Sequence, residues 1–226
     1  MHIPDGYLGP MTCGFFYVVM LPIWTVASRI VKRTLDVKQV PMLAIGAAFS
    51  FVIMMFNVPI PGGSSGHAVG GVLVAILLGP WAACIAITVA LVVQALLFGD
   101  GGIMAIGANC FNMAFVLPFL GYYLYKAISY NAPIGSNRRI IAAGIAGYVA
   151  LNIAALFTGV EFGLQPLLHH TASGQALYCP YGLNVSVPVM LGEHLLIFGW
   201  VEAIVTFLAV KYLQKHSPEL LKEGSR

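Results

Sequence analysis

The stretch IIAAGIAGYVALNIAALFT, residues 140–158, contains no charged side chain. An α-helix needs about 20 predominantly apolar residues to cross the hydrocarbon core of a bilayer. The whole composition agrees with this environment, because 59% of the 226 residues are hydrophobic and only 8% are charged. A soluble domain carries about 25% charged residues. The chain is therefore predicted to be an integral membrane protein.

Similar apolar stretches recur along the chain, separated by prolines and glycines that favour turns. Seven helices are predicted, at Cys13–Ile30, Pro41–Asn57, His67–Leu78, Trp81–Phe98, Ile103–Tyr125, Ile140–Thr158 and Val189–Tyr212. The third is short for a span and should end before Gly79-Pro80. The predicted fold class is an all-α integral membrane protein, a compact bundle of about seven transmembrane helices.

One polytopic membrane domain is expected over residues 1–226, with no soluble domain and no linker. It comprises an extracellular N-terminal segment (1–10), a helix bundle (11–213) and a cytoplasmic tail (214–226). All eleven basic residues fall in three clusters: Arg29, Lys32, Arg33 and Lys38; Lys126, Arg138 and Arg139; Lys211, Lys215, Lys222 and Arg226. Counting seven helices puts them on one side, so the positive-inside rule places the N-terminus outside and the C-terminus inside.

The predicted outer segments contain no lysine or arginine, yet most histidines lie there. The outer histidines are His2, His67, His169 and His170, with His194 just below them. Imidazoles on a surface without cations attract a divalent metal rather than repel it. A metal site on the outer side is therefore the leading hypothesis.

The first two residues, Met1-His2, form a chelating sequence if the terminal amine is free. The amine and the His2 amide nitrogen close a five-membered ring around a metal, and the amide and imidazole nitrogens of His2 close a six-membered ring. A fourth nitrogen from His67, in the loop GGSSGHAVGG (62–71), would complete a square. Such a site suits Ni(II), Cu(II) or low-spin Co(II), and it should weaken in acid. The alternatives are a frayed terminus and a histidine at a helix start, capped by Ser64 or Ser65.

Three segments resemble the signatures of the CbiM/NikM family: MHIPDGYL (1–8), GGSSGHAVGG (62–71) and LLFGDGGIMAIGANCFNM (96–113). The last helix, GEHLLIFGWVEAIVTFLAV (192–210), is also similar. The family comprises substrate-specific membrane components, or S components, of energy-coupling factor transporters for nickel and cobalt. The resemblance implies a compact helical bundle with an extra N-terminal helix. It also implies that Met1, His2 and His67 are the metal ligands.

The resemblance further implies uptake of Ni²⁺ or Co²⁺ as the transported substrate, with no organic cofactor and no enzymatic activity in this chain. The expected partners are a transmembrane coupling (T) subunit, two ATP-binding-cassette ATPases and a small accessory membrane subunit, in the cell membrane of a prokaryote. The chain has no G-x-x-x-x-G-K-[ST] motif, so ATP hydrolysis would belong to the partners. Contact with the lipid bilayer is expected, and contact with nucleic acid is not.

Several polar residues outside this set need a role. Asp100, in the turn after Phe98, is expected to close that turn and cap the next helix rather than to support a ligand histidine. Asn109 and Asn112 are expected to tether loops or helices. The ionisable residues expected inside a span are Glu193, His194 and Glu202; a Glu–His contact that fixes packing and an ion path remain open alternatives.

The remaining candidates are expected to be structural. His169 and His170 fall in a predicted loop, 159–188, that is expected to cover the outer surface. Three cysteines are expected to pack inside helices, and Cys179 is expected to face outside. Pairs of small residues, such as Ala143 with Gly147 and Ala68 with Gly71, are expected to allow close contact between helices within the bundle.

Two other classes of protein are weighed against the S component. A stand-alone secondary metal transporter or channel would need a polar path through the bilayer, and one or two glutamates on a single helix make a thin path. An intramembrane metalloenzyme would need a general base beside the metal, and the chain has no HExxH or similar motif. Nickel and cobalt are not distinguished, because the same four nitrogens accept both.

Overall fold

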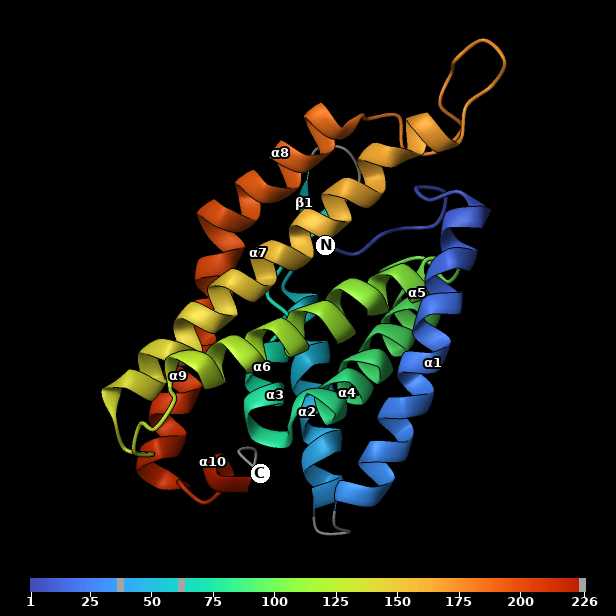
Figure 1. Ribbon diagram of the computed structural model, residues 1–226. Helices are drawn as coiled ribbons and strands as arrows, with labels where there is room; N and C mark the ends of the chain where they lie inside the picture. Colours follow the sequence, from blue (N-terminus) through green and yellow to red (C-terminus); the bar gives the residue numbers. More distant parts are fainter. Residues whose placement is uncertain (36–38, 61–63, 224–226) are drawn as a thin grey trace.

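The computed structural model describes residues 1–35, 39–60 and 64–223. Its secondary structure is mostly helical and falls into seven helical segments plus a short C-terminal turn, α10 (Leu220–Glu223) (Figure 1). The segments are α1 (Pro10–Thr34); α2 (Val40–Met55); α3 (Gly71–Leu78); α4 (Pro80–Val93) with η2 (Gln94–Phe98); α5 (Ile106–Asn109) with η3 (Cys110–Val116) and α6 (Leu117–Ile128); α7 (Asn137–Leu168); and α8 (Leu183–Glu193) with η4 (His194–Phe198) and α9 (Gly199–His216). The three η elements are π-helical turns inside longer helices.

Each of the seven predicted helices lies on one of these segments, so the helical prediction is confirmed. Four segments are long and apolar enough to cross a membrane, within the described residues: Pro10–Thr34, Pro80–Phe98, Asn137–Leu168 and Leu183–His216. Helix α2 is apolar but shorter. Helix α3 has eight residues, about 12 Å at 1.5 Å per residue, and it ends at Gly79 before Pro80 as predicted. The number of membrane crossings stays a prediction.

The expectation of an all-α chain is wrong in one detail. Strands β1 (Val58–Ile60) and β2 (Ser64–Gly66) pair antiparallel before His67. His67 therefore lies in an extended segment ahead of α3 rather than at a helix start. The N-cap of α3 is Gly70, whose φ of 71° lies in the left-handed region that favours glycine. The capping role expected for Ser64 or Ser65 is thus wrong, while Gly62 and Gly63 lie outside the described residues.

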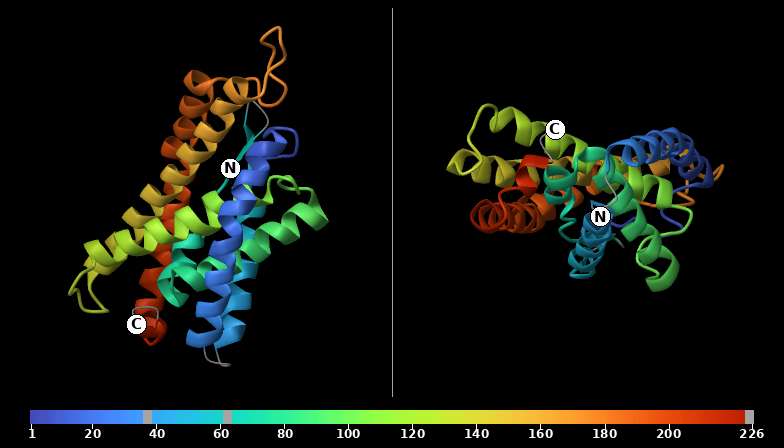
Figure 2. Two further views of the ribbon diagram at one scale, coloured as in Figure 1. Left: turned by 45° about the vertical axis from the view of Figure 1, so that its right-hand side comes forward. Right: turned by 90° about the horizontal axis from the view of Figure 1, so that it is seen from below.

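The predicted loop 159–188 is also too long. Helix α7 continues ten residues beyond Thr158 to Leu168, and α8 begins at Leu183. Two polar residues of this added stretch, Glu161 and Gln165, are buried in α7 and hydrogen-bonded there. The connection is therefore 169–182. Its tip projects beyond the ends of α7 and α8 (Figures 1 and 2), whereas Cys179 near its end is buried against the N-terminal segment.

Helix α7 packs against α6, α8 and α9, and α2 and α3 pack against α4. Small side chains let these helices approach closely: Ala143 is fully buried, and a Cβ at Gly147 would lie 3.2 Å from Thr206 Oγ1. A Cβ at Gly71 would meet Leu117, so the small residues serve contacts inside the bundle as predicted.

The two ends of the molecule differ. In Figure 1 the C-terminal end of α1, the turn between α6 and α7, and the C-terminal end of α9 lie at the lower end. These are the segments that carry or adjoin the described lysines and arginines. The start of α1 and the segment 169–182 lie toward the opposite end, and the N-terminus lies inside the bundle.

Candidate metal site at the N-terminus

The N-terminal segment is buried rather than frayed. The side chains of Met1 and Ile3 are fully buried. Asn109 holds the main chain of Ile3 from both sides, because its Oδ1 accepts from the Ile3 N–H at 2.8 Å and its Nδ2 donates to the Ile3 carbonyl at 3.1 Å. Gly102 N–H also donates to that carbonyl at 2.8 Å. The tethering role expected for Asn109 is confirmed.

The rest of the segment is fixed in the same way. The Asp5 carboxylate accepts from the main-chain N–H groups of Ile103 and Met104 at 3.0 and 2.9 Å. Gly9 N–H donates to Gln165 Oε1 at 2.9 Å. Cys179 N–H donates to the Tyr7 carbonyl at 3.1 Å. The Cys179 side chain is buried, so the expectation that it faces outside is wrong. Cys13, Cys84 and Cys110 are buried in helices as predicted.

His2 is 3% exposed, and its two ring nitrogens have different surroundings. Nε2 lies 3.2 Å from Gln94 Oε1. Because a carboxamide oxygen can only accept, Nε2 carries the proton and Nδ1 holds a lone pair. Nδ1 has no hydrogen-bond partner within the residues that the structure describes. Nδ1 is the ring nitrogen that can chelate together with the main-chain amide of the same residue.

His67 presents a second free nitrogen. Its side chain is fully buried, Nδ1 lies 3.1 Å from the Ala68 carbonyl, and Nε2 has no partner in the described structure. The His2 and His67 rings lie 4.5 Å apart between centroids, with an interplanar angle of 34°. The structure thus brings two of the predicted ligands into contact. Each has one lone pair buried without a hydrogen bond, which is costly unless something binds it.

Electrostatics at this place favour a cation. Burial lowers the pKa of the Met1 amine from 8.0 to about 5, although the negative charges of Glu193 and Asp100 oppose this shift. Burial, followed by the charge of the amine, lowers the pKa of His2 to about 3, although the hydrogen bond that His2 donates to Gln94 opposes this shift. Both groups are therefore neutral at pH 7 and available as ligands without losing a proton first.

Asp100 does more than close a turn. Its Oδ1 lies 3.5 Å from His2 Nδ1, and its Oδ2 accepts from Asn57 Nδ2 at 3.0 Å. Because His2 is neutral, this contact is no ion pair, and the carboxylate faces a lone pair. A cation between or beside them would relieve that repulsion. The role in supporting a ligand histidine, which the sequence did not favour, is therefore the better interpretation of Asp100.

Glu202 supports the segment that carries the other predicted ligand, His67. Its Oε2 accepts from the main-chain N–H groups of Val69 and Gly70, both at 2.8 Å, and so fixes the segment that carries His67. A carboxylate that accepts two N–H groups is a strong tether. The sequence identified Glu202 as buried without assigning this contact. The sequence analysis missed Gln94. Its position as a polar residue near the end of an apolar helix was a signal that could have identified it.

A further buried acid was also missed. Glu161 in α7 is 5% exposed, and its Oε2 accepts from Asn112 Nδ2 at 2.9 Å. Asn112 also contacts Thr158, which confirms the role expected of it in tethering neighbouring helices.

The remaining histidines belong to other contacts. His169 bonds to Thr12 through Nε2 at 3.3 Å and packs against Tyr178, and His170 is exposed and pairs through its main chain with Ala176. Both lie in or beside the projecting segment 169–182. His216 is exposed near the C-terminal end of α9.

Within the described residues, no group of three or more His, Cys, Asp or Glu side chains could hold a metal ion. Two imidazoles alone would make a weak site. The main-chain nitrogens of Met1 and His2 would complete four ligands, and the His2 amide donates no hydrogen bond within the described chain. The donor set of amine, amide and two imidazoles is the one that square-planar Ni(II) prefers.

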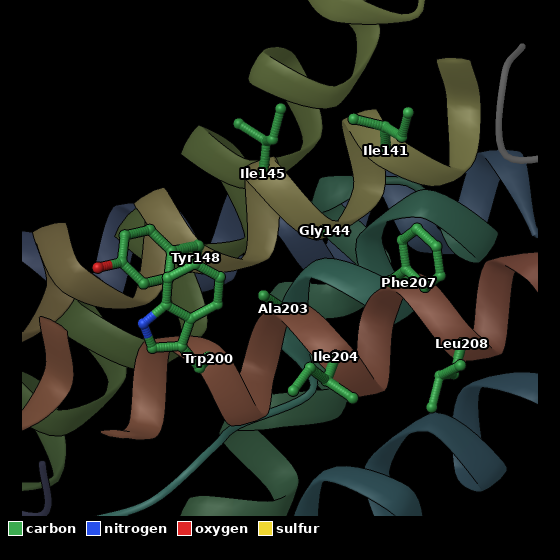
Figure 3. Close-up of a pocket in the computed structure, with 9 residues that line it drawn as sticks. All are labelled: Ile141, Gly144, Ile145, Tyr148, Trp200, Ala203, Ile204, Phe207 and Leu208. Atoms are coloured by element: carbon green, nitrogen blue, oxygen red, sulfur yellow. The ribbon is translucent and has the colours of Figure 1, made fainter. Parts of the chain in front are cut away.

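A separate groove lies between α7 and α9 (Figure 3). Its volume is about 500 Å³. It is lined by Ile141, Gly144, Ile145, Tyr148, Trp200, Ala203, Ile204, Phe207 and Leu208. Because these side chains are almost entirely apolar, the groove offers nothing to a metal ion.

Known proteins similar to this chain are described as metal transport proteins. Residues 2–220 match the family model described as the cobalt uptake substrate-specific transmembrane region. A putative metal transport protein of Methanocaldococcus jannaschii is 50% identical over 221 residues, covering 97% of this chain and 94% of the relative. A fused nickel transport protein, NikMN, of Rhodobacter capsulatus is 54% identical over 221 residues. That match covers 98% of this chain but only 64% of the relative's length.

A solved structure is also similar. It is a crystal structure described as a truncated transition metal transporter, with 55% sequence identity and a TM-score of 0.91. The match covers 96% of this chain and 99% of the other.

Proposed function

Because this chain belongs to the CbiM family of cobalt uptake substrate-specific transmembrane proteins, we propose that it binds a nickel or cobalt ion for ATP-driven import. Members of this family are components of metal transporters and are not enzymes. The observation that supports the binding role most strongly is the pair of buried, unpartnered nitrogens on His2 and His67.

The proposed ligands are four nitrogens. Met1 supplies its terminal amine, His2 supplies its deprotonated amide and Nδ1, and His67 supplies Nε2. Gln94 and Glu202 hold the two ligand histidines in place, one through the His2 ring and one through the main chain after His67. Supporting contacts of this kind orient metal ligands in many sites. Asp100 adds negative charge beside the ion.

The site is proposed to face the outside of the cell, with the C-terminus in the cytoplasm and all seven helical segments in one membrane domain. The separation of the basic segments from the N-terminal site supports this orientation (Figure 1). The segment 1–10 is then the extracellular chelating segment, 11–213 the bundle and 214–226 the cytoplasmic tail; residues 224–226 lie outside the described part.

The chain is proposed to act as the substrate-specific subunit of an energy-coupling factor transporter. A T subunit and two ATP-binding-cassette ATPases would supply the energy, with a small accessory membrane subunit as a further partner. Relatives described as fused nickel transport proteins are longer than this chain, which agrees with additional components in the working transporter. The whole cycle of uptake is therefore proposed for the assembly and not for this subunit alone.

Two glycines added before Met1 test the chelate. They leave both histidines intact and move the amine out of reach of a five-membered ring with the His2 amide, so nickel affinity should fall by more than about 100-fold, beyond the loss typical of supporting residues. A single glycine is avoided because it would place the histidine third in the chain, where an amine, two amides and an imidazole form a chelate of their own. Calorimetric titration with Ni²⁺ of protein that carries no polyhistidine tag measures the affinity. Two glycines inserted after Gly174, in the exposed projecting segment, are the matched control and should leave the affinity unchanged.

Unchanged nickel affinity in the extended protein would show that the amine is not a ligand. Nickel uptake by the purified chain alone in proteoliposomes would favour the alternative, a stand-alone secondary transporter or channel.

A further inference from the structure

His194 has the surroundings of a metal-ligating histidine but is not among the proposed ligands. It is the first residue of η4, the π-helical turn between α8 and α9, and its side chain is fully buried. Its Nε2 has no hydrogen-bond partner in the part of the chain that the structure describes. A buried imidazole nitrogen without a partner costs free energy, so its presence requires an explanation.

The other ring nitrogen of His194 is firmly held. Nδ1 lies 2.8 Å from the Met190 carbonyl and 3.1 Å from Glu193 Oε1. With two acceptors beside it, Nδ1 carries the proton and Nε2 holds the lone pair. His67 has the same arrangement, with Nδ1 on the Ala68 carbonyl and Nε2 free. Metal-ligating histidines characteristically donate their second N–H to a carbonyl or carboxylate in this way.

The two histidines are joined by a short chain of contacts. The His194 ring packs against Phe198, with 5.6 Å between centroids. The Phe198 ring lies directly against Gly66, where a Cβ would overlap it, and Gly66 precedes His67. The two free Nε2 atoms thus belong to one buried region.

The backbone around His194 also resembles the backbone around the N-terminal site. Of the three π-helical turns, η2 begins with Gln94, which holds His2, and η3 follows Asn109, which holds Ile3. Wide π turns inside helices frequently mark functional sites. The third, η4, begins with His194, whose free nitrogen has no other evident use.

We propose that His194 is a second nickel or cobalt ligand, which receives the ion through Nε2 when the N-terminal chelate opens. The inference rests on the proposed function above. In this step the bonds from the metal to the Met1 amine and the His2 nitrogens break, and the amide nitrogen regains its proton from water. The ion keeps His67 and gains His194, with water in the remaining positions. Exchange of a deprotonated amide for an imidazole weakens the hold on the ion before release.

The test uses the chain extended by two glycines before Met1, with and without His194→Gln, and Ni²⁺ alone as the probe. The extended protein should lose the tight site but keep a weaker one, and His194→Gln should weaken that residual site by at least about tenfold, as loss of a ligand does. His170→Gln, at an exposed histidine of the projecting segment, is the matched control and should not change it.

X-ray absorption at the nickel edge gives an independent measurement, because it identifies the ligands on nickel, which an affinity alone does not. The extended protein should show two imidazoles on nickel, and His194→Gln should reduce this to one. Equal residual binding with and without His194, or no residual binding at all, would overturn the role of His194 and leave the chelate standing. Tight binding that survives the glycine extension would instead overturn the chelate, which separates the two failures.

Discussion

The site around His2 and His67 and the groove between α7 and α9 are opposite kinds of region. The groove has a volume of about 500 Å³ and apolar walls, and the hydroxyl of Tyr148 in its wall donates to the Leu195 carbonyl (Figure 3). The site is filled by the protein's own N-terminus, yet it contains imidazole nitrogens that have no hydrogen-bond partner among the described residues.

The difference shows which observation locates function in this bundle. An apolar hollow between helices that face lipid is expected in a membrane protein and carries no chemistry of its own. Buried polar atoms without partners are rare in folded proteins because each costs free energy. In this chain, unpartnered nitrogens therefore indicate the metal site better than empty volume does. The predictions below test that contrast, from the largest expected effect to the smallest.

Removal of a ligand should separate the two regions most clearly. His67→Ala takes away the fourth nitrogen, and nickel affinity should fall by more than about 100-fold, beyond the loss typical of supporting residues. Phe207→Ala in the groove removes a larger side chain and should leave affinity unchanged. Calorimetric titration of both variants measures the contrast. Equal losses of nickel affinity in the two variants would mean that binding depends on general packing, and the site would then not differ from the groove in function.

Removal of a supporting contact should have the next largest effect. Gln94→Leu leaves His2 Nε2 without its acceptor, so the ring loses its fixed tautomer and orientation. Nickel affinity should fall by about 10- to 100-fold. Gln214→Leu is a matched control, because Gln214 makes a single bond to the Ser136 carbonyl near the C-terminal end of α9. Similar results for the two glutamines would contradict a specific role for Gln94.

The helices could be predicted from the sequence because apolar length is a local signal. The grouping of Met1, His2 and His67 in one site was predicted from the N-terminal Met-His pattern and the histidine in the glycine-rich loop. Prediction failed where a polar residue is satisfied by a distant partner. The predicted helix ended at Thr158, but α7 continues through Glu161 and Gln165, which are bonded to Asn112 and to the Gly9 N–H. Asp100 suggested an ordinary turn, because nothing local shows that His2 lies beside it. Such contacts depend on the packing of segments 49 to 156 residues apart in the sequence.

Proton release on metal binding should distinguish the buried site from an exposed chelate. In the protein, the Met1 amine has a pKa of about 5 and His2 of about 3, so both are already neutral at pH 7. Binding should then release about one proton, from the amide. A free peptide with the sequence MHIPDGYL has an ordinary amine pKa near 8 and should release about two.

The sign of the pH dependence follows from these values. Between pH 8 and about pH 5, each unit of acidification should weaken nickel binding to the protein about tenfold, and more steeply for the peptide, because each released proton contributes one such factor. Below about pH 5 the amine of the protein takes up a proton, and its own curve should steepen. Calorimetry in two buffers of different ionisation enthalpy counts the protons. Two protons released by the protein at pH 7 would show that burial does not hold the amine neutral.

A pair of glycine substitutions should give the smallest difference in nickel affinity. The pair tests how closely each region is packed. At Gly144, in the groove, a Cβ would lie 3.5 Å from the nearest atoms, an ordinary contact, so Gly144→Ala should leave nickel affinity unchanged. At Gly102 a Cβ would overlap the main-chain nitrogen and carboxylate of Asp5. Because Gly102 N–H also holds the Ile3 carbonyl, Gly102→Ala should displace the N-terminal segment.

The chelate tolerates only small shifts, since its four nitrogens must share a plane, so nickel affinity of Gly102→Ala should fall severalfold. The melting temperature of the metal-free protein provides the control, because it should change little for either variant if the strain stays within the N-terminal segment. Unchanged nickel affinity of Gly102→Ala would mean that the N-terminal segment adjusts without moving its ligands. The close fit of the N-terminus would then be a matter of packing, and only the free nitrogens would set the site apart from the groove.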